Sequence, residues 1–285
     1  MKITDIQTIG ILGAGIMGRG IALTSALKGF EVILFDIDQK ILDSALEYTR
    51  NFLSQSLAKG KMDSANKDAV ERRIQVTTDA EKVKGGIVIE AVPENLELKR
   101  KILLAVEKTN DFKSILLTNT STIPVTRIAS GLKDPSKFAG LHFFNPAPLM
   151  KLVEVIPGVM TDRNVVELLM QFATKLGKEA VLASDEPGFI VNRVARHYYL
   201  EALKIAEDGV AGIEAIDRLT EASGFRMGPF RLMDLIGVET NHEVTKSLYE
   251  SFYGDGKFRP SRMQQKKVDA GHFGQKTGKG FYDCP

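Results

Sequence analysis

Blocks of hydrophobic and polar positions alternate along the first two-thirds of the chain. Short runs rich in β-branched residues predict strands at residues 6–12, 31–36, 85–92, 114–121, 137–144, 151–157 and 179–184. Between several of these runs, apolar residues recur every three to four positions, which predicts helices at residues 16–29, 41–60 and 95–108. Alternating strands and helices are typical of a parallel, doubly wound sheet, so we expect an α/β fold for this part of the chain.

The pattern changes after Ser184. The turn-rich sequence DEPG, residues 185–188, is followed by three helical stretches, several of which end at a glycine, and no alternating strand pattern follows it. These stretches cover residues 189–209, 212–224 and 232–254. We therefore predict an α/β domain over residues 1–184 and an all-helical domain over residues 188–285.

Composition narrows the classes of function. The formal net charge of +2 is too small to indicate binding to nucleic acid. Cys284 is the only cysteine, so the sequence predicts no internal disulfide. No run approaches the ~20 apolar residues of a membrane span, and glycines interrupt the apolar stretch at residues 6–18, where a signal peptide would need an unbroken one. We expect a cytoplasmic protein that binds neither nucleic acid nor membranes.

Residues 13–18 read GAGIMG, which fits the G-x-G-x-x-G pattern. A predicted strand precedes this hexamer and a predicted helix follows it, as in a Rossmann-type dinucleotide site. Gly13 permits the tight turn, Gly15 lets a pyrophosphate approach the backbone, and Gly18 lets the helix pack closely. Ile16 and Met17 lie at the start of the helix, where free N–H groups face the phosphates. The alternative is a glycine-rich turn in another kind of α/β protein.

Asp36 ends the second predicted strand, 18 residues after Gly18. A carboxylate at this position accepts hydrogen bonds from the ribose hydroxyls of the adenosine and repels a 2′-phosphate. The following residues, IDQ, offer no arginine for such a phosphate. The sequence therefore favours NAD over NADP.

An ionisable residue lies within each of two apolar runs in GLHFFNPAPLMKLVEV, residues 140–155. If NPAPLM makes a tight reversal, His142 and Glu154, which lie six residues on either side of Pro148, become cross-strand neighbours. The carboxylate would fix the tautomer of the imidazole, and the other ring nitrogen would then exchange a proton with an alcohol during hydride transfer. The alternative is a core histidine with satisfied hydrogen bonds and a surface glutamate on an edge strand.

Other polar residues lie at the predicted ends of elements. NTST, residues 119–122, follows an apolar strand at the end where ligands bind in open α/β sheets, although one of these residues is equally expected to cap a helix that begins near PVTRIAS. Asn192 is a candidate substrate contact or merely a polar helix position. The lysines of residues 58–67 are a solvated helix end or a contact for the phosphates of a substrate tail. The remaining histidines have no partners at metal-ligand spacing, so we predict no metal site.

Taken together, these residues resemble the 3-hydroxyacyl-CoA dehydrogenase family, in particular its short bacterial 3-hydroxybutyryl-CoA members. The resemblance covers essentially the whole chain and rests on GAGIMGRGIA, IEAVPENLELK, NTSTIPVTRIA, GLHFFNPAPLMKLVEV, PGFIVNR, MGPF and KTGKGFY. It implies an NAD-dependent, reversible oxidation of (S)-3-hydroxyacyl-CoA to 3-ketoacyl-CoA. It also implies that the first domain binds NAD, that the helical domain contributes to substrate binding and to a homodimer, and that the domains close over the ligands.

The resemblance also assigns roles to residues. It makes His142 the catalytic acid/base and Glu154 its partner, and it places Ser121 and Asn192 against the substrate near the reacting centre. Positions near the cofactor match Glu94, Lys99, Asn145 and Lys276. The chain departs from the family pattern at Arg196, His197 and Arg226, in the helical domain, which leaves chain-length preference open.

Three alternatives remain at this stage. The first is a dehydrogenase of a different hydroxy acid, such as a sugar acid, which a pocket without affinity for CoA would favour. A non-catalytic, crystallin-like member of the family would have no chemical reason to keep His142, Glu154, Ser121 and Asn192 together. A module that only senses NAD would need the cofactor site without the His–Glu pair.

Overall fold

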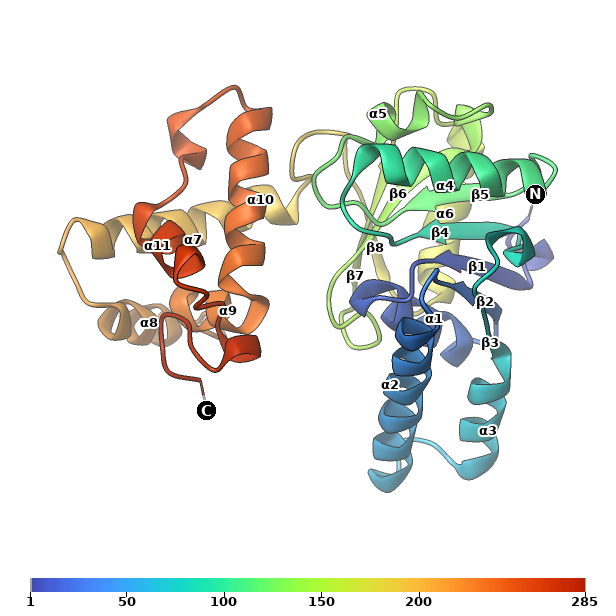
Figure 1. Ribbon diagram of the computed structural model, residues 1–285, viewed down its shortest axis with the longest axis horizontal. Helices are drawn as coiled ribbons and strands as arrows, with labels where there is room; N and C mark the ends of the chain where they lie inside the picture. The colour runs from blue at the N-terminus through green and yellow to red at the C-terminus, as the bar shows by residue number, and fades with distance from the viewer. Residues whose placement is uncertain (1, 285) are drawn as a thin grey trace. The chain divides into compact units, whose positions relative to one another are not determined.

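The computed structural model describes residues 2–284. The chain divides into two compact units, Met1–Glu186 and Pro187–Pro285. The first is an α/β unit, and the named elements of the second, over residues 187–284, are all helices, as the sequence pattern predicts (Figure 1).

The first unit is built on one eight-stranded sheet. The strand order is β3-β2-β1-β4-β5-β6-β7-β8, and each neighbouring pair is parallel except β6 and β7, which are antiparallel. The strands are β1 (Thr8–Leu12), β2 (Glu31–Phe35), β3 (Ile74–Thr77), β4 (Ile87–Glu90), β5 (Ile115–Thr118), β6 (Phe138–Phe143), β7 (Leu152–Pro157) and β8 (Glu179–Leu182). The doubly wound, Rossmann-type sheet is confirmed, with one reversal of direction at its β6–β7 hairpin.

Helices cover both faces of this sheet. Its helices are α1 (Ile16–Leu27), α2 (Gln39–Ala58), α3 (Ser64–Arg73), α4 (Leu96–Thr109), α5 (Val125–Ala129) and α6 (Arg163–Lys175). The strand residues Ile9 and Ile87 share one hydrophobic core with Leu23 of α1 and Phe172 of α6. The side chain of Glu90 points to the opposite face, where it meets α4. This two-sided packing buries the strands and leaves their carboxyl ends to carry polar residues.

The sequence pattern does not reveal every element. Strand β3 contains only four residues, between the charged end of α3 and a turn, so no run long enough to predict a strand exists there. Helix α6 was not predicted, although its buried residues Val165, Leu168, Leu169 and Phe172 recur with helical spacing between two predicted strands.

The second unit consists of α7 (Val191–Glu207), α8 (Ile213–Ala222), α9 (Pro229–Ile236), α10 (Val238–Ser251) and α11 (Arg262–Asp269). The prediction of one helix over residues 232–254 is wrong. Gly237, with φ of +106°, ends α9 and precedes α10, and its N–H donates to the carbonyl of Met233. Glycine adopts this backbone conformation without the steric cost that a Cβ would add, so the chain changes direction here.

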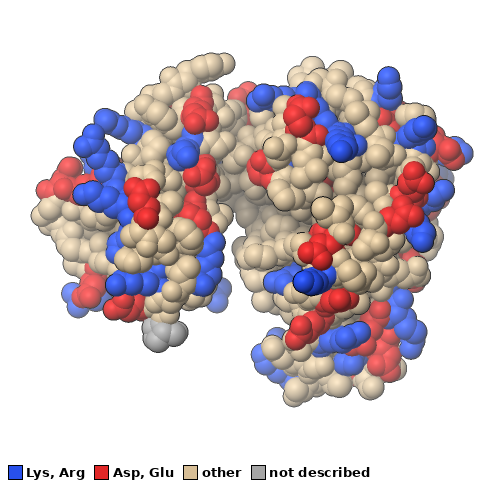
Figure 2. Space-filling model, in the orientation of Figure 1, with Lys and Arg blue, Asp and Glu red and all other residues tan. Residues whose placement is uncertain are grey.

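Short 3-10 turns lie between or beyond these elements, at Ile3–Asp5, Ala80–Lys82, Pro135–Lys137, Gly256–Phe258 and Gln275–Thr277. On the face shown in Figure 2, basic and acidic side chains are interspersed over each unit. Among residues 2–284, no helix is long and apolar enough to cross a membrane. Within the same range, no group of three or more His, Cys, Asp or Glu residues is placed to hold a metal ion.

Candidate active site

The glycine-rich turn joins β1 to α1. A Cβ would meet different surroundings at each of its three glycines. Gly13 has φ of +96°, and a Cβ there would lie 2.8 Å from the carbonyl oxygen of Ala91. A Cβ on Gly18 would collide with the carbonyl oxygen of Gly13. Gly15 is exposed, and nothing lies within 4 Å of the position that its Cβ would take. The open side of the turn is therefore at Gly15, directly before the N-terminus of α1.

Asp36, which follows β2, is hydrogen-bonded to this turn. Its Oδ2 accepts from the backbone N–H of Ala14 at 2.9 Å, and its Oδ1 accepts from the N–H of Asp38 at 3.2 Å. The side chain of Ile16 is exposed at the start of α1, whereas Met17 packs partly against the core. The predicted dinucleotide residues therefore lie together at the carboxyl ends of β1 and β2.

His142 and Glu154 are directly opposite each other in the β6–β7 pair. His142 Nδ1 lies 2.7 Å from Glu154 Oε2, and the two residues are 4% and 1% exposed. The predicted cross-strand pairing is confirmed. The alternative of a surface glutamate on an edge strand is wrong, because β7 lies between β6 and β8 and Glu154 is enclosed.

Ser121 completes a line of three side chains. Its Oγ lies 3.2 Å from His142 Nε2, the ring nitrogen opposite to the one that faces Glu154. An ionised carboxylate only accepts hydrogen bonds, so Nδ1 carries the proton in the contact with Glu154. In the neutral imidazole Nε2 is then an acceptor, and the hydroxyl of Ser121 donates to it. Nε2 is the nitrogen at which this arrangement can take up or release a proton.

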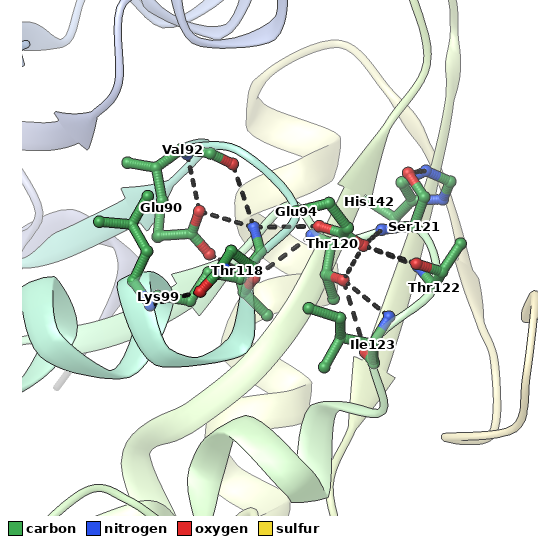
Figure 3. Close-up of polar contacts among 12 residues, drawn as sticks. Glu90, Val92, Glu94, Lys99, Thr118, Thr120, Ser121, Thr122, Ile123 and His142 are labelled. Carbon is green, nitrogen blue, oxygen red and sulfur yellow. Dashed lines mark hydrogen bonds and ion pairs between the residues drawn. The ribbon is translucent and has the colours of Figure 1, made fainter. Parts of the chain in front are cut away.

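Glu94 organises the turn that carries Ser121 (Figure 3). Its Oε1 accepts from the backbone N–H groups of Ser121 and Thr122, both at 3.0 Å, and from the hydroxyls of Thr120 and Thr122. Its Oε2 lies 3.2 Å from the ammonium of Lys99. Burial alone would raise the pKa of Glu94, but the attraction of Lys99 and these donors outweigh it and lower the pKa. Glu94 therefore holds the turn as a carboxylate.

Lys99 and Glu90 form an ion pair beneath this turn. Lys99 is 1% exposed and Glu90 is fully buried, and the ammonium lies 2.8 Å from Glu90 Oε1. Burial raises the pKa of Glu90, with Lys99 and the hydroxyl of Thr118 opposing the shift. Lys99 was predicted from the sequence, whereas Glu90 was not. A carboxylate that ends the fully apolar run IVI, with a lysine nine residues later, is the signal that could have found it.

The alternative reading of residues 119–122 as a helix cap is wrong. The N-terminus of α5 is capped by Asp185, whose two carboxylate oxygens accept from the N–H groups of Val125 and Thr126, both at 2.7 Å. Asn119 directly follows β5 and links it to β6, because its Oδ1 accepts from the N–H of Phe143 at 2.8 Å. The residues that follow β5 thus face β6 and His142.

Comparison with known proteins identifies the family. Residues 8–186 match the model described as 3-hydroxyacyl-CoA dehydrogenase, NAD binding domain. Residues 188–284 match the model of the C-terminal domain of the same family. The chain belongs to the 3-hydroxyacyl-CoA dehydrogenase family. Its first unit is therefore an NAD-binding domain, and its relatives are oxidoreductases.

Full-length relatives are similar throughout. The chain is 38% identical to the probable 3-hydroxybutyryl-CoA dehydrogenase of Bacillus subtilis, over 98% of each chain. It is 41% identical to the 3-hydroxyadipyl-CoA dehydrogenase of Escherichia coli, but it spans only 59% of the length of that protein. The crystal structure of (S)-3-hydroxybutyryl-CoA dehydrogenase from Ralstonia eutropha superposes with a TM-score of 0.93 at 35% identity, over 98% of this chain and 99% of the other.

Three predicted contact residues, Asn145, Asn192 and Lys276, remain to be placed in their own units. Asn145 is exposed in the loop after β6. Asn192 lies in the first turn of α7, and Lys276 forms an ion pair with Glu239. Asn192 and Lys276 belong to the helical unit, so their contacts with the ligands stay predictions.

Of the three departures from the family pattern, Arg196 is in the interior of the helical unit. Its guanidinium donates to the carbonyl of Asn241 at 2.8 Å and to the hydroxyl of Thr245 at 2.9 Å, and burial lowers its pKa to about 10. His197 and Arg226 are exposed. Arg196 therefore contributes to the packing of α7 against α10.

Proposed function

We propose that this family member catalyses the reversible, NAD-dependent oxidation of (S)-3-hydroxybutyryl-CoA to acetoacetyl-CoA. The observation that carries the proposal is the line Glu154–His142–Ser121 near the carboxyl end of β6, in a sheet whose first βα turn fits a dinucleotide. The names of the Bacillus and Ralstonia relatives, which match over nearly their whole length, support this substrate class.

The residues of the first unit fit NAD. Gly13, Gly15 and Gly18 form a turn that is open at Gly15, so the phosphates can reach the backbone N–H groups at the start of α1, beside Ile16 and Met17. Asp36 lies next to this turn, where it would accept hydrogen bonds from the ribose hydroxyls and disfavour a 2′-phosphate. Further cofactor contacts are assigned to Glu94, Asn145 and Lys276. Lys99 would act on the cofactor side through Glu94, since its own ammonium is buried.

The chemistry follows from the arrangement of His142. Bound NAD would accept the hydride that leaves C3 of the substrate. His142 Nε2 takes the hydroxyl proton of the substrate, so the C–O single bond becomes a carbonyl and the imidazole becomes an imidazolium. Glu154 stabilises that cation at Nδ1, and Ser121 is placed to hydrogen-bond the substrate oxygen near Nε2. Asn192 is assigned to the same substrate region from the helical unit, which we also propose to form the contact of a homodimer.

A set of substrates tests the proposal. Oxidation of NADH is measured with acetoacetyl-CoA, with longer and dicarboxylic 3-ketoacyl-CoA esters, and with free 3-keto acids. We expect fast turnover of acetoacetyl-CoA and little or no turnover of the free acids. Preference for a free hydroxy or keto acid would favour the sugar-acid alternative, and NADH binding without turnover of any of these compounds would favour the non-catalytic one.

A further inference from the structure

A closed network of hydrogen bonds surrounds the turn that carries Ser121. We call it the Lys99 network, and it consists of Glu90, Lys99, Glu94, Thr120 and Thr118. Lys99 bridges the two carboxylates, the hydroxyl of Thr120 donates to Glu94, the N–H of Thr120 donates to the hydroxyl of Thr118, and that hydroxyl donates to Glu90 Oε2 at 2.7 Å. Figure 3 shows these residues converging from three segments of the chain.

Glu90 connects the Lys99 side of this network to the Thr118 side. Its Oε1 accepts from Lys99 and from the backbone N–H of Val92 at 2.7 Å, and its Oε2 accepts from Thr118. Through Lys99 it reaches Glu94, and through Thr118 it reaches the backbone of Thr120. Glu90 is directly opposite Thr118 in the β4–β5 pair, so the parallel register brings the two together.

The charge on Glu90 keeps Lys99 in place, and through Lys99 it affects Glu94. The ammonium of Lys99 has three acceptors within reach, namely Glu90, Glu94 and the carbonyl of Val92 at 3.3 Å. A buried ammonium is costly without a buried counter-charge, and Glu94 is half exposed, with 37% of its side chain accessible. Without the charge on Glu90, Lys99 would be drawn toward Glu94 or toward solvent. The four donors on Glu94 Oε1 would then lose their common position.

We infer that Glu90 is a positioning residue for the proposed reaction: through Lys99 and Glu94 it holds Ser121 at its 3.2 Å distance from His142 Nε2. This inference rests on the proposed function of Ser121 and His142. Glu90 itself touches neither of them. Displacement of a reacting group by about an ångström costs roughly 100-fold in rate, so loss of the anchor is expected to lower kcat about 10- to 100-fold.

A double-mutant cycle tests the inference. We would measure kcat for Glu90→Gln, Ser121→Ala and the combined variant with acetoacetyl-CoA and NADH. If Glu90 acts through Ser121, the combined variant is no slower than Ser121→Ala alone. Two results would overturn the inference: full kcat in Glu90→Gln, or losses that multiply in the combined variant.

Glu107→Gln is the matched control. Glu107 lies in α4 and, like Glu90, is a buried carboxylate, but it accepts from the N–H groups of Lys133 and Asp134 at 3.0 and 2.7 Å, in a different loop. It should lower the melting temperature without changing kcat. If Glu90→Gln does not fold, Glu90→Gln combined with Lys99→Met removes the pair as a whole and enters the same cycle with the same criteria.

A second readout separates this inference from the proposed function. The chain contains four histidines, so the signal of His142 can be assigned in the NMR spectrum of protein with isotopically labelled histidine. Glu90→Gln should shift that signal in the same direction as Ser121→Ala, even if acetoacetyl-CoA is not the substrate. An unchanged His142 signal in folded Glu90→Gln would overturn the inference whatever the substrate is.

Discussion

His142 Nδ1 lies 2.7 Å from Glu154 Oε2 across the antiparallel β6–β7 pair, with both side chains enclosed. The histidine therefore has a fixed tautomer, and its second nitrogen points to Ser121. The proposed role of His142 as a general base requires this orientation, because proton transfer takes place over a hydrogen-bond distance in the reacting complex.

Glu154→Gln should lower kcat by roughly 100-fold or more, since the amide no longer stabilises the imidazolium and its NH₂ group favours the wrong tautomer. The measurement is kcat with saturating NADH and acetoacetyl-CoA. Glu179→Gln, an exposed glutamate on β8, is the control and should keep wild-type kcat. Equal kcat in Glu154→Gln and wild type would show that the carboxylate charge is not needed.

Gly15→Ala and Gly18→Ala should have different effects on the melting temperature and the affinity for NADH. A Cβ at Gly15 meets nothing in the protein, so Gly15→Ala should keep the wild-type melting temperature while the affinity for NADH falls. A Cβ at Gly18 collides with the carbonyl oxygen of Gly13, so Gly18→Ala should lower both. Thermal unfolding and NADH titration would distinguish them. Unchanged NADH affinity in Gly15→Ala would place the phosphates elsewhere.

Asp36→Asn should raise the Kd for NADH about 10-fold, because it removes a charge-assisted hydrogen bond worth ~1.5 kcal/mol. The ratio between the affinities for NADH and NADPH should also become smaller. The amide oxygen can still accept from Ala14, so the turn is kept. Asp38→Asn is the control, because Asp38 caps α2 by accepting from Lys40 at 2.9 Å and has no proposed ribose contact. An undiminished preference for NADH in Asp36→Asn would contradict the assignment.

The stabilising effect of Glu94 should depend on pH. Its pKa is lowered in the folded protein below the ordinary value of 4.5, so its contribution is fully present above pH 4.5 and is lost as the pH falls through the folded pKa. Melting temperatures of wild type and Glu94→Gln should therefore differ at neutral pH and converge in acid. Glu97→Gln, an exposed neighbour in α4, should track the wild type throughout. A constant difference between wild type and Glu94→Gln would contradict this.

The parts of the site that depend on residues close together in the sequence could be predicted from it. The glycine turn follows from spacing, and the pairing of His142 with Glu154 follows from their mirrored positions around a proline-rich reversal. The Lys99 network was not predictable in the same way, because it depends on the register between β4 and β5, which places Glu90 opposite Thr118. The break at Gly237 was missed because a glycine inside a periodic apolar stretch resembles a tolerated helix position.

The proposed role of His142 is tested most directly by comparing wild type with His142→Gln. Oxidation of NADH is followed with acetoacetyl-CoA, and NADH affinity is measured separately by titration. General acid–base catalysis contributes ~10²- to 10⁴-fold, so His142→Gln should lose about that much of kcat while it binds NADH as the wild type does. A His142→Gln variant that keeps wild-type kcat would contradict this role, because the Glu154–His142–Ser121 line would then have no part in the chemistry.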